Sequence, residues 1–146
     1  MAKVYTSSVI AAPVERVWEL VRDFNGLPNW FPGVTDSHIE PGKPAGQAGC
    51  VRNFGLEGGP RMREQLLAIS DESHSISYKM LEGPLPVSSY QATVRLLAVT
   101  DGNQTFAELT SEFACPDQAQ ESGLAGFLGQ TYQGAFDRLK QHFGKR

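Results

Sequence analysis

Two ionisable side chains, Arg52 and Glu64, fall on the apolar faces of two segments whose alternation predicts β-strands. Successive side chains of a strand point to opposite faces, so inward-facing Phe54 and Met62 place Arg52 and Glu64 inward with them. A charge in an apolar space is costly unless it is paired and hydrogen-bonded. The pattern therefore predicts one of three roles. The two residues form a structural ion pair or emerge at a rim, they orient the polar end of an apolar ligand, or Glu64 acts in general acid–base catalysis with its pKa raised by burial.

Two tyrosines each contribute a polar hydroxyl group on an otherwise apolar aromatic ring. Tyr78 is predicted to face inward with Met80, and Tyr90 faces inward on the following strand. Such hydroxyls either bond to the backbone while the ring packs, or donate to a ligand oxygen. Trp30 and Phe31 are placed near the mouth of the same space, where we expect them to act as a hydrophobic plug.

Other reactive side chains give no catalytic pattern. Cys50 and Cys115 lack metal-ligand spacing and are expected to be free thiols, and we expect neither a metal nor a cofactor. The loop over residues 57–60 has two glycines but no following helix or lysine, so it predicts a hairpin turn or a mobile lid and not a phosphate cradle. No nucleophile arrangement is seen around the histidines, which are expected at the surface: His38, His74 and His142.

The elements that position these side chains follow from the spacing of apolar residues. A strand over residues 3–10 is followed by a helix from Pro13 to near Gly26 and by a short helix over residues 29–31. The chain from residue 34 to 113 is then predicted to alternate between strand and turn. The expected strands cover residues 49–55, 62–70, 75–81, 88–100 and 105–113. Short turns between them predict an antiparallel meander with one covered and one wet face.

The alternation also assigns faces in two other strands. Ala68 is expected to face inward at the end of its strand. In the last strand Leu109 and Phe113 are expected inside and Glu108 and Glu112 outside, unless a bulge reverses the phase.

A helix running to about residue 143 closes the chain and carries a wide apolar stripe. Gly126, Gly129 and Gly134 lie inside it, each at a cost of about 1 kcal/mol relative to alanine. They predict either close packing of the helix on the sheet or a helix thinned to leave room beside it. The stripe consists of Leu124, Phe127, Leu128, Thr131, Tyr132, Ala135, Phe136, Leu139 and Phe143.

Composition bounds the function. The 146 residues suit one domain over residues 1–146, which at this length buries about 70% of its unfolded surface. A net charge of −3 and scattered basic residues argue against a nucleic-acid partner. No apolar run approaches the ~20 residues of a membrane span, and no secretory signal is evident. We therefore expect a cytoplasmic protein, either monomer or homodimer.

Several stretches resemble a known superfamily. Ala12-Pro13 followed by Val17-Trp18, and then residues 30–34 (Trp-Phe-Pro-Gly-Val), is similar to the opening of START-like/SRPBCC proteins. Residues 49–52, 63–67 and 83–90 resemble the polyketide cyclase/dehydrase-like and MxaD-like bacterial branch, and more distantly the plant abscisic-acid receptors and birch-pollen-allergen proteins. The receptors' Ser-Gly-Leu-Pro-Ala gate and His-Arg-Leu latch are absent, so the resemblance does not imply abscisic-acid sensing.

The resemblance implies an α+β helix-grip fold, with a curved antiparallel sheet around the long C-terminal helix and an apolar cavity between them. Fold alone does not choose a function. We expect binding of a hydrophobic small molecule, lipid-like or polycyclic. The alternatives are a cyclase/dehydratase-type enzyme that uses Glu64 or a tyrosine, and a protein-binding accessory subunit. The expected ligand-binding residues are Arg52, Phe54, Leu56, Met62, Glu64, Leu66, Tyr78, Met80, Tyr90, Leu109, Phe113, Phe127, Thr131 and Ala135.

Overall fold

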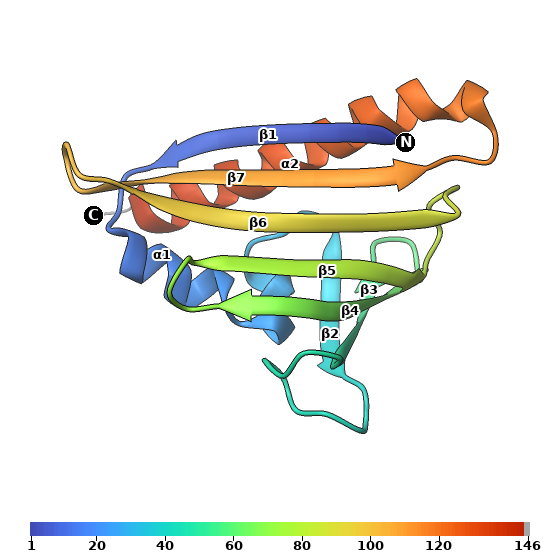
Figure 1. Ribbon diagram of the computed structural model, residues 1–146, viewed down its shortest axis with the longest axis horizontal. Coiled ribbons are helices and arrows are strands. Elements are labelled where there is room, and N and C mark those ends of the chain that lie inside the picture. The colour runs from blue at the N-terminus through green and yellow to red at the C-terminus, as the bar shows by residue number, and fades with distance from the viewer. Residues whose placement is uncertain (145–146) are drawn as a thin grey trace.

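The computed structural model describes residues 1–144 as one curved sheet with helices on its concave side (Figure 1). The elements in chain order are β1 (Ala2–Ile10), α1 (Val14–Val21), the 3-10 helix η1 (Phe24–Asn29), β2 (Val34–Ile39), β3 (Val51–Leu56), β4 (Arg61–Ser70), β5 (Ser75–Glu82), β6 (Ser89–Val99), β7 (Gln104–Ala114), the 3-10 helix η2 (Gln118–Gln120) and α2 (Glu121–Gly144).

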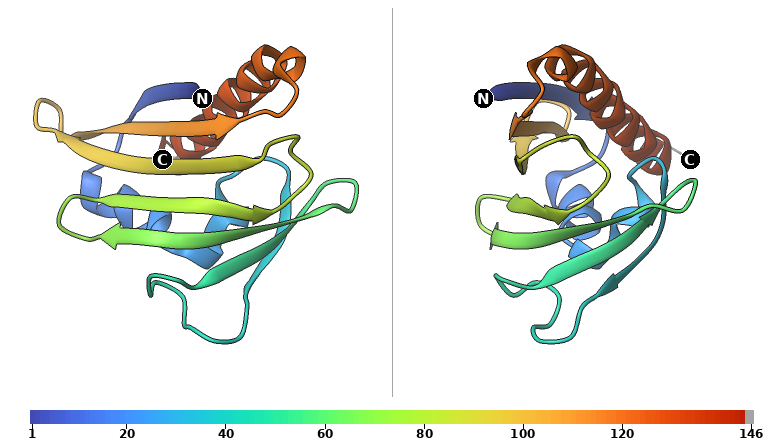
Figure 2. Two further views of the ribbon diagram at one scale, coloured as in Figure 1. Left: turned by 45° about the vertical axis from the view of Figure 1, so that its right-hand side comes forward. Right: turned by 90° about the vertical axis from the view of Figure 1, so that its right-hand side faces the viewer.

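The sheet is antiparallel, with the strand order β1-β7-β6-β5-β4-β3-β2. Strands β2 to β7 form the predicted meander, and β1 pairs with β7 along its whole length, from Ala2↔Phe113 to Ile10↔Thr105. Helix α2 runs across the concave side and packs mainly on β1 (Figure 2). The sheet therefore curves around the terminal helix, as the resemblance implies.

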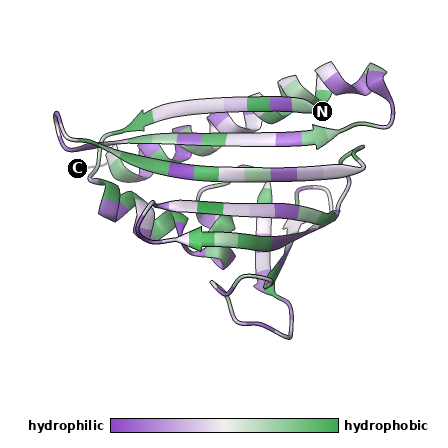
Figure 3. Cartoon of the chain, viewed as in Figure 1, coloured by the Kyte–Doolittle hydropathy of each residue, from purple (hydrophilic) through white to green (hydrophobic). Residues whose placement is uncertain are grey.

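Alternation along the strands builds the interior. In β7 every second residue from Thr105 to Phe113 is buried, and the residues between them are half-exposed. The predicted phase of this strand is confirmed: Glu108 and Glu112 face outward, where they contact Tyr5 and Lys3 of β1. The same alternation appears as bands of contrasting hydropathy along the strands (Figure 3).

One inward assignment is wrong. Ala68 is exposed, because the pairing of β4 with β5 shifts register between Leu66 and Ala68. Such a shift is a bulge, which turns the side chains beyond it to the other face. Residue alternation alone does not reveal where a bulge interrupts it.

The helices after β1 also differ from the prediction. The expected helix to Gly26 ends at Val21, and the expected short helix over residues 29–31 is the 3-10 helix η1, which ends at Asn29. The boundary lies at Asp23, whose side chain accepts a hydrogen bond from the backbone N–H of Asn25. This cap starts a new helix at the point where the apolar spacing continues unbroken.

Helix α2 buries six side chains of the predicted stripe: Leu124, Leu128, Tyr132, Ala135, Phe136 and Leu139. Its glycines play different parts. A Cβ on Gly134 would lie 3.2 Å from Cγ of Pro32, whereas a Cβ on Gly126 would meet nothing within 4 Å. Close packing therefore explains Gly134 and does not explain Gly126. No helix within residues 1–144 is long and apolar enough to cross a bilayer.

Candidate ligand-binding pocket

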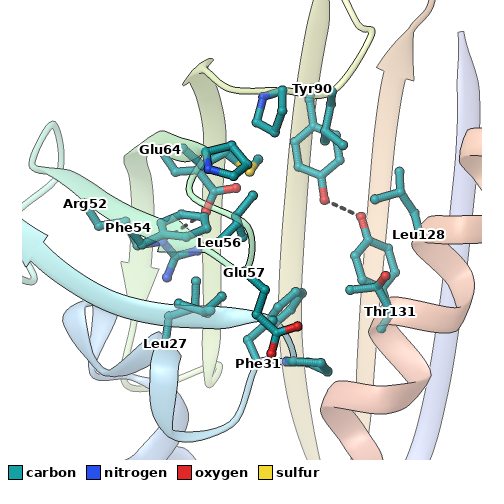
Figure 4. Close-up of a pocket in the computed structure, with 18 of the residues that line it drawn as sticks. Leu27, Phe31, Arg52, Phe54, Leu56, Glu57, Glu64, Tyr90, Leu128 and Thr131 are labelled. Carbon is teal, nitrogen blue, oxygen red and sulfur yellow. Dashed lines mark hydrogen bonds and ion pairs between the residues drawn. The ribbon is translucent and has the colours of Figure 1, made fainter.

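A pocket of about 480 Å³ lies between the inner face of β3–β6, the segment from η1 to β2, and α2. Its rim contains exposed residues such as Glu57, Pro84 and Phe127, and its inner part contains the buried Arg52 and Tyr78. The pocket thus leads from the surface into the interior (Figure 4). The lining residues are Leu27, Phe31, Pro32, Gly33, Val34, Arg52, Phe54, Leu56, Glu57, Pro60, Met62, Glu64, Tyr78, Pro84, Leu85, Tyr90, Phe127, Leu128, Thr131 and Tyr132.

Arg52 and Glu64 form an ion pair in the inner part of this pocket. They are direct cross-strand partners on β3 and β4, and each side chain is only 5% exposed. Nε and Nη2 of Arg52 donate to Oε1 of Glu64 over 3.0 and 2.6 Å. Burial raises the pKa of Glu64, while the charge and hydrogen bonds of Arg52 act in the opposite direction.

The guanidinium of Arg52 also contacts Phe24 and Tyr78. Nη1 donates to the backbone carbonyl oxygen of Phe24 over 3.1 Å. The carbon at its centre lies 4.1 Å from the ring centroid of Phe24 and 4.6 Å from that of Tyr78. Aromatic faces attract a cation, so these rings stabilise the buried charge as well as packing against it.

A second polar group consists of buried hydroxyls that link the sheet to α2. Tyr132 of α2 donates to Oγ of Ser111 over 2.9 Å, and the hydroxyls of Tyr132 and Tyr90 are hydrogen-bonded to each other. Burial raises the pKa of Tyr132 to about 12 and holds the pKa values of Tyr90 and Tyr78 well above 10. These phenols are therefore neutral near physiological pH and act through hydrogen bonds.

The structure brings many of the sequence-predicted site residues together. Phe31, expected as a plug, lines the pocket, whereas Trp30 is buried and does not line it. The predicted ligand-binding residues found in the lining are Arg52, Phe54, Leu56, Met62, Glu64, Tyr78, Tyr90, Phe127 and Thr131.

Five predicted wall residues do not line the pocket, which corrects the expected walls. Met80 is partly buried and packs against the core, and the other four are buried in it: Leu66, Leu109, Phe113 and Ala135. Strand alternation identifies residues that face inward, but it does not separate those under a packed helix from those beside an open space. Here α1 packs on β6 and β7, and α2 packs on β1 and β7, so only part of the inner face is left open.

Several lining residues were not predicted. Leu27 comes from η1, Pro32 and Gly33 come from the turn after it, and Val34 begins β2. Pro84 and Leu85 come from the loop before β6. These segments have no periodicity from which an inward face could be assigned. Residues 30–34 and 83–90 carry part of the family resemblance, and that was the available signal for most of them. Leu128 and Tyr132 belong to the predicted apolar stripe of α2, and their spacing of four residues from each other was the available signal.

The loop over residues 57–60 forms the predicted hairpin turn between β3 and β4. Gly58 and Gly59 have φ values of 91° and 107°, which favour glycine, and the N–H of Leu56 donates to the carbonyl of Pro60 over 2.8 Å. Glu57 and Pro60 of this turn lie at the rim of the pocket.

The remaining reactive side chains lie elsewhere. Cys50 is buried and Cys115 half-buried, and both thiols are free, as expected. His38 and His142 are exposed and His74 is half-buried. Within the described chain, no three His, Cys, Asp or Glu residues are grouped in a way that would hold a metal ion.

Comparison with known proteins assigns the chain to a family. The sequence matches the family described as "Polyketide cyclase / dehydrase and lipid transport" over residues 1–144. The chain belongs to this family. The predicted resemblance to the polyketide cyclase/dehydrase branch is thereby confirmed. No curated protein matches the sequence.

Solved structures agree with this assignment. The protein XoxI from Bacillus cereus is 27% identical, with a TM-score of 0.87 over 98% of this chain and 96% of that one. A protein from Nitrosospira multiformis is 28% identical, with a TM-score of 0.83 over 97% of this chain and 96% of that one. The ginseng major latex-like protein 151 from Panax ginseng is 15% identical, with a TM-score of 0.81 over 97% of both chains, and shares the fold. The predicted α+β helix-grip fold is confirmed.

Proposed function

We propose that this protein reversibly binds a hydrophobic small molecule, lipid-like or polycyclic, in the pocket between the sheet and α2. The supporting observation is an unfilled space of about 480 Å³ with largely apolar walls and a few polar groups at its inner part. Small-molecule sites generally have this size and this distribution of groups. The family description names both cyclase/dehydrase activity and lipid transport, and both involve apolar molecules.

The walls suggest which forces drive binding. Apolar side chains such as Phe54, Met62 and Leu128 gain about 25 cal/mol for each Å² removed from water, before the costs of association. The neutral tyrosines and the Arg52–Glu64 pair are few and fixed in place. They would orient a ligand and supply little of the affinity.

Two measurements test this proposal. Native mass spectrometry of protein purified from its own source should show a co-purifying hydrophobic molecule. In addition, Thr131→Trp should fill the pocket, because Thr131 lines it from α2, while Gln130→Trp places the same side chain at an exposed neighbouring position. We expect Thr131→Trp to lower affinity for the co-purified molecule at least ~10-fold and Gln130→Trp to leave it unchanged. Equal affinity in both variants, each folded, would contradict binding in this pocket.

An enzyme is the second candidate, favoured by one observation. Glu64 is a buried carboxyl group with a raised pKa in a pocket that opens to the surface, as a general acid or base requires. If the protein catalyses a proton transfer on its ligand, Glu64→Gln should abolish turnover of the co-purified molecule and retain its binding. If that molecule is recovered unchanged after incubation with wild-type protein, simple binding is favoured.

A protein-binding accessory subunit remains the third interpretation of the sequence. It requires no internal space, so a pocket filled by side chains would have favoured it. The open pocket supports ligand binding instead.

A further inference from the structure

Glu64 presents one of its two carboxylate oxygens to the pocket. Both hydrogen bonds from Arg52 end on Oε1, and no donor within residues 1–144 reaches Oε2. Every completely buried side-chain nitrogen or oxygen in this part of the chain has a hydrogen-bond partner. Oε2 is therefore not completely buried, and since Glu64 lines the pocket, its accessible surface faces that space (Figure 4).

The hydroxyl of Tyr78 lies close to the same pair. Tyr78 is on β5, next to β4, and its ring covers one face of the Arg52 guanidinium. A side-chain hydrogen bond from Arg52 acts to lower the pKa of Tyr78, against the larger effect of burial, and a phenol oxygen that accepts from Arg52 still has its own proton to donate. The inner part of the pocket thus offers a charged acceptor on Glu64 and a phenol on Tyr78 that can donate.

Arg52 attracts an anion less than its charge alone would suggest. Three of its five N–H groups, one on each nitrogen, already donate to Glu64 or to the carbonyl of Phe24. Its charge is compensated by Glu64, so the carboxylate of a ligand would meet Oε2 as a second negative charge in a poorly solvated place. A hydroxyl group can donate to Oε2 and accept from Tyr78 at the same oxygen, whereas a carboxylate can only accept.

We propose that this pocket selects apolar molecules that carry a hydroxyl group, phenol or alcohol, at the buried end, and rejects carboxylates of the same shape. This inference rests on the proposed function and deepens it, since it names the ligand class. It separates alcohols and phenols from fatty acids and aromatic acids, which apolar walls alone would accept equally.

The test uses probes of matched shape at neutral pH. Hydroxypyrene, pyrene and pyrenecarboxylate share one ring system, and dodecanol and dodecanoate form an alkyl pair. Affinities are measured by fluorescence titration for the ring set and by displacement for the alkyl pair. We expect each hydroxyl compound to bind at least ~10-fold more tightly than its carboxylate, because a charge-assisted hydrogen bond replaces a charge repulsion.

Variants assign the selection to Glu64. Glu64→Gln removes the negative charge and leaves Arg52 unpaired, so the preference should reverse: the hydroxyl compounds weaken and the carboxylates tighten, each by ~10-fold. If the single variant fails to fold, the double variant Arg52→Met/Glu64→Leu is the alternative, because it contains no unpaired buried charge. It should bind pyrene more tightly than hydroxypyrene, because the hydroxyl group then has no partner in the pocket. Glu112→Gln removes a carboxylate from an outer-face ion pair with Lys3 and should keep the wild-type preference.

The outcomes separate the two claims. If pyrene or dodecanol binds wild-type protein but hydroxyl and carboxylate compounds bind equally, the selection fails and the proposed function stands. A wild-type preference for carboxylates also overturns the selection. If no probe of either shape binds, the proposed function fails together with it.

Discussion

Replacement of Arg52 by methionine should destabilise the protein by an amount that depends on pH. Methionine keeps much of the side-chain length but removes the charge that faces Glu64, a carboxyl group that is 5% exposed. Without Arg52, burial raises the pKa of Glu64 with nothing to oppose it. We therefore expect the folded variant to hold Glu64 in its protonated form.

The magnitude follows from the cost of protonating Glu64. From an unfolded-state pKa of 4.5, this cost is RT ln(1 + 10^(pH − pKa)), which is about 3.4 kcal/mol at pH 7 and about 0.8 kcal/mol at pH 5. The sign follows from linkage: a carboxyl group whose folded pKa is raised contributes stability below its unfolded pKa and loses it as pH rises. Loss of the hydrogen bond to Phe24 adds about 1 kcal/mol at either pH. We expect a total of about 4 kcal/mol at pH 7 and about 2 kcal/mol at pH 5.

Glu64→Gln is the matched comparison. It leaves the arginine unpaired and removes the carboxyl group, so the variant has no titrating carboxyl group at the pair. Breaking a buried pair from either side costs about 3–5 kcal/mol, whereas replacing both partners by apolar residues is often neutral. Arg52→Met/Glu64→Leu should therefore be more stable than either single variant. The exposed Lys3–Glu112 pair, at 3.4 Å with side chains 71% and 46% exposed, should contribute about 1 kcal/mol or less.

Urea denaturation at the two pH values measures all of these effects. Relative to Glu64→Gln, the unfolding free energy of Arg52→Met should rise by about 2.6 kcal/mol as pH falls from 7 to 5. Parallel pH dependence in the two variants would refute the reasoning, since it would mean that Glu64 stays charged in the folded protein without Arg52. A double variant less stable than both single variants would also refute it.

Two further predictions concern regions outside the pocket. Gly126→Ala should raise the melting temperature by about 2–4 °C, because alanine favours a helix by about 1 kcal/mol and its Cβ would meet nothing; Gly134→Ala should gain less, because its Cβ would lie 3.2 Å from Pro32. Equal gains in differential scanning calorimetry would contradict this. The Arg63 guanidinium lowers the pKa of Glu40 to about 2, so Glu40 contributes stability above about pH 4.5 that is lost as pH falls toward 2. Glu40→Gln should remove that part of the acid loss, and acid-denaturation curves that stay parallel to the wild-type curve would contradict it.

The strands could be predicted because their burial is regular. One face is covered from Tyr90 to Leu96 in β6 and from Thr105 to Phe113 in β7, so every second residue there is buried and most of these are apolar. The alternation therefore gives both the element and its inward side. Prediction failed where local hydrogen bonds or register outweigh that pattern. The cap at Asp23 divides one apparent helix into two, and the register shift after Leu66 turns Ala68 outward.

The polar residues of the candidate site could be predicted for a different reason, but their geometry could not. Arg52 and Glu64 stand out because they are charged residues at positions where the alternation predicts apolar side chains. Such a mismatch can be seen in the sequence without knowing the fold. That they are direct partners on adjacent strands depends on the β3–β4 register, and which oxygen stays free depends on where the guanidinium lies between Phe24 and Tyr78. The free oxygen is what distinguishes a hydroxyl ligand from a carboxylate. The sequence pattern can therefore predict a polar group in the pocket, but the chemistry that this group selects depends on the three-dimensional arrangement around it.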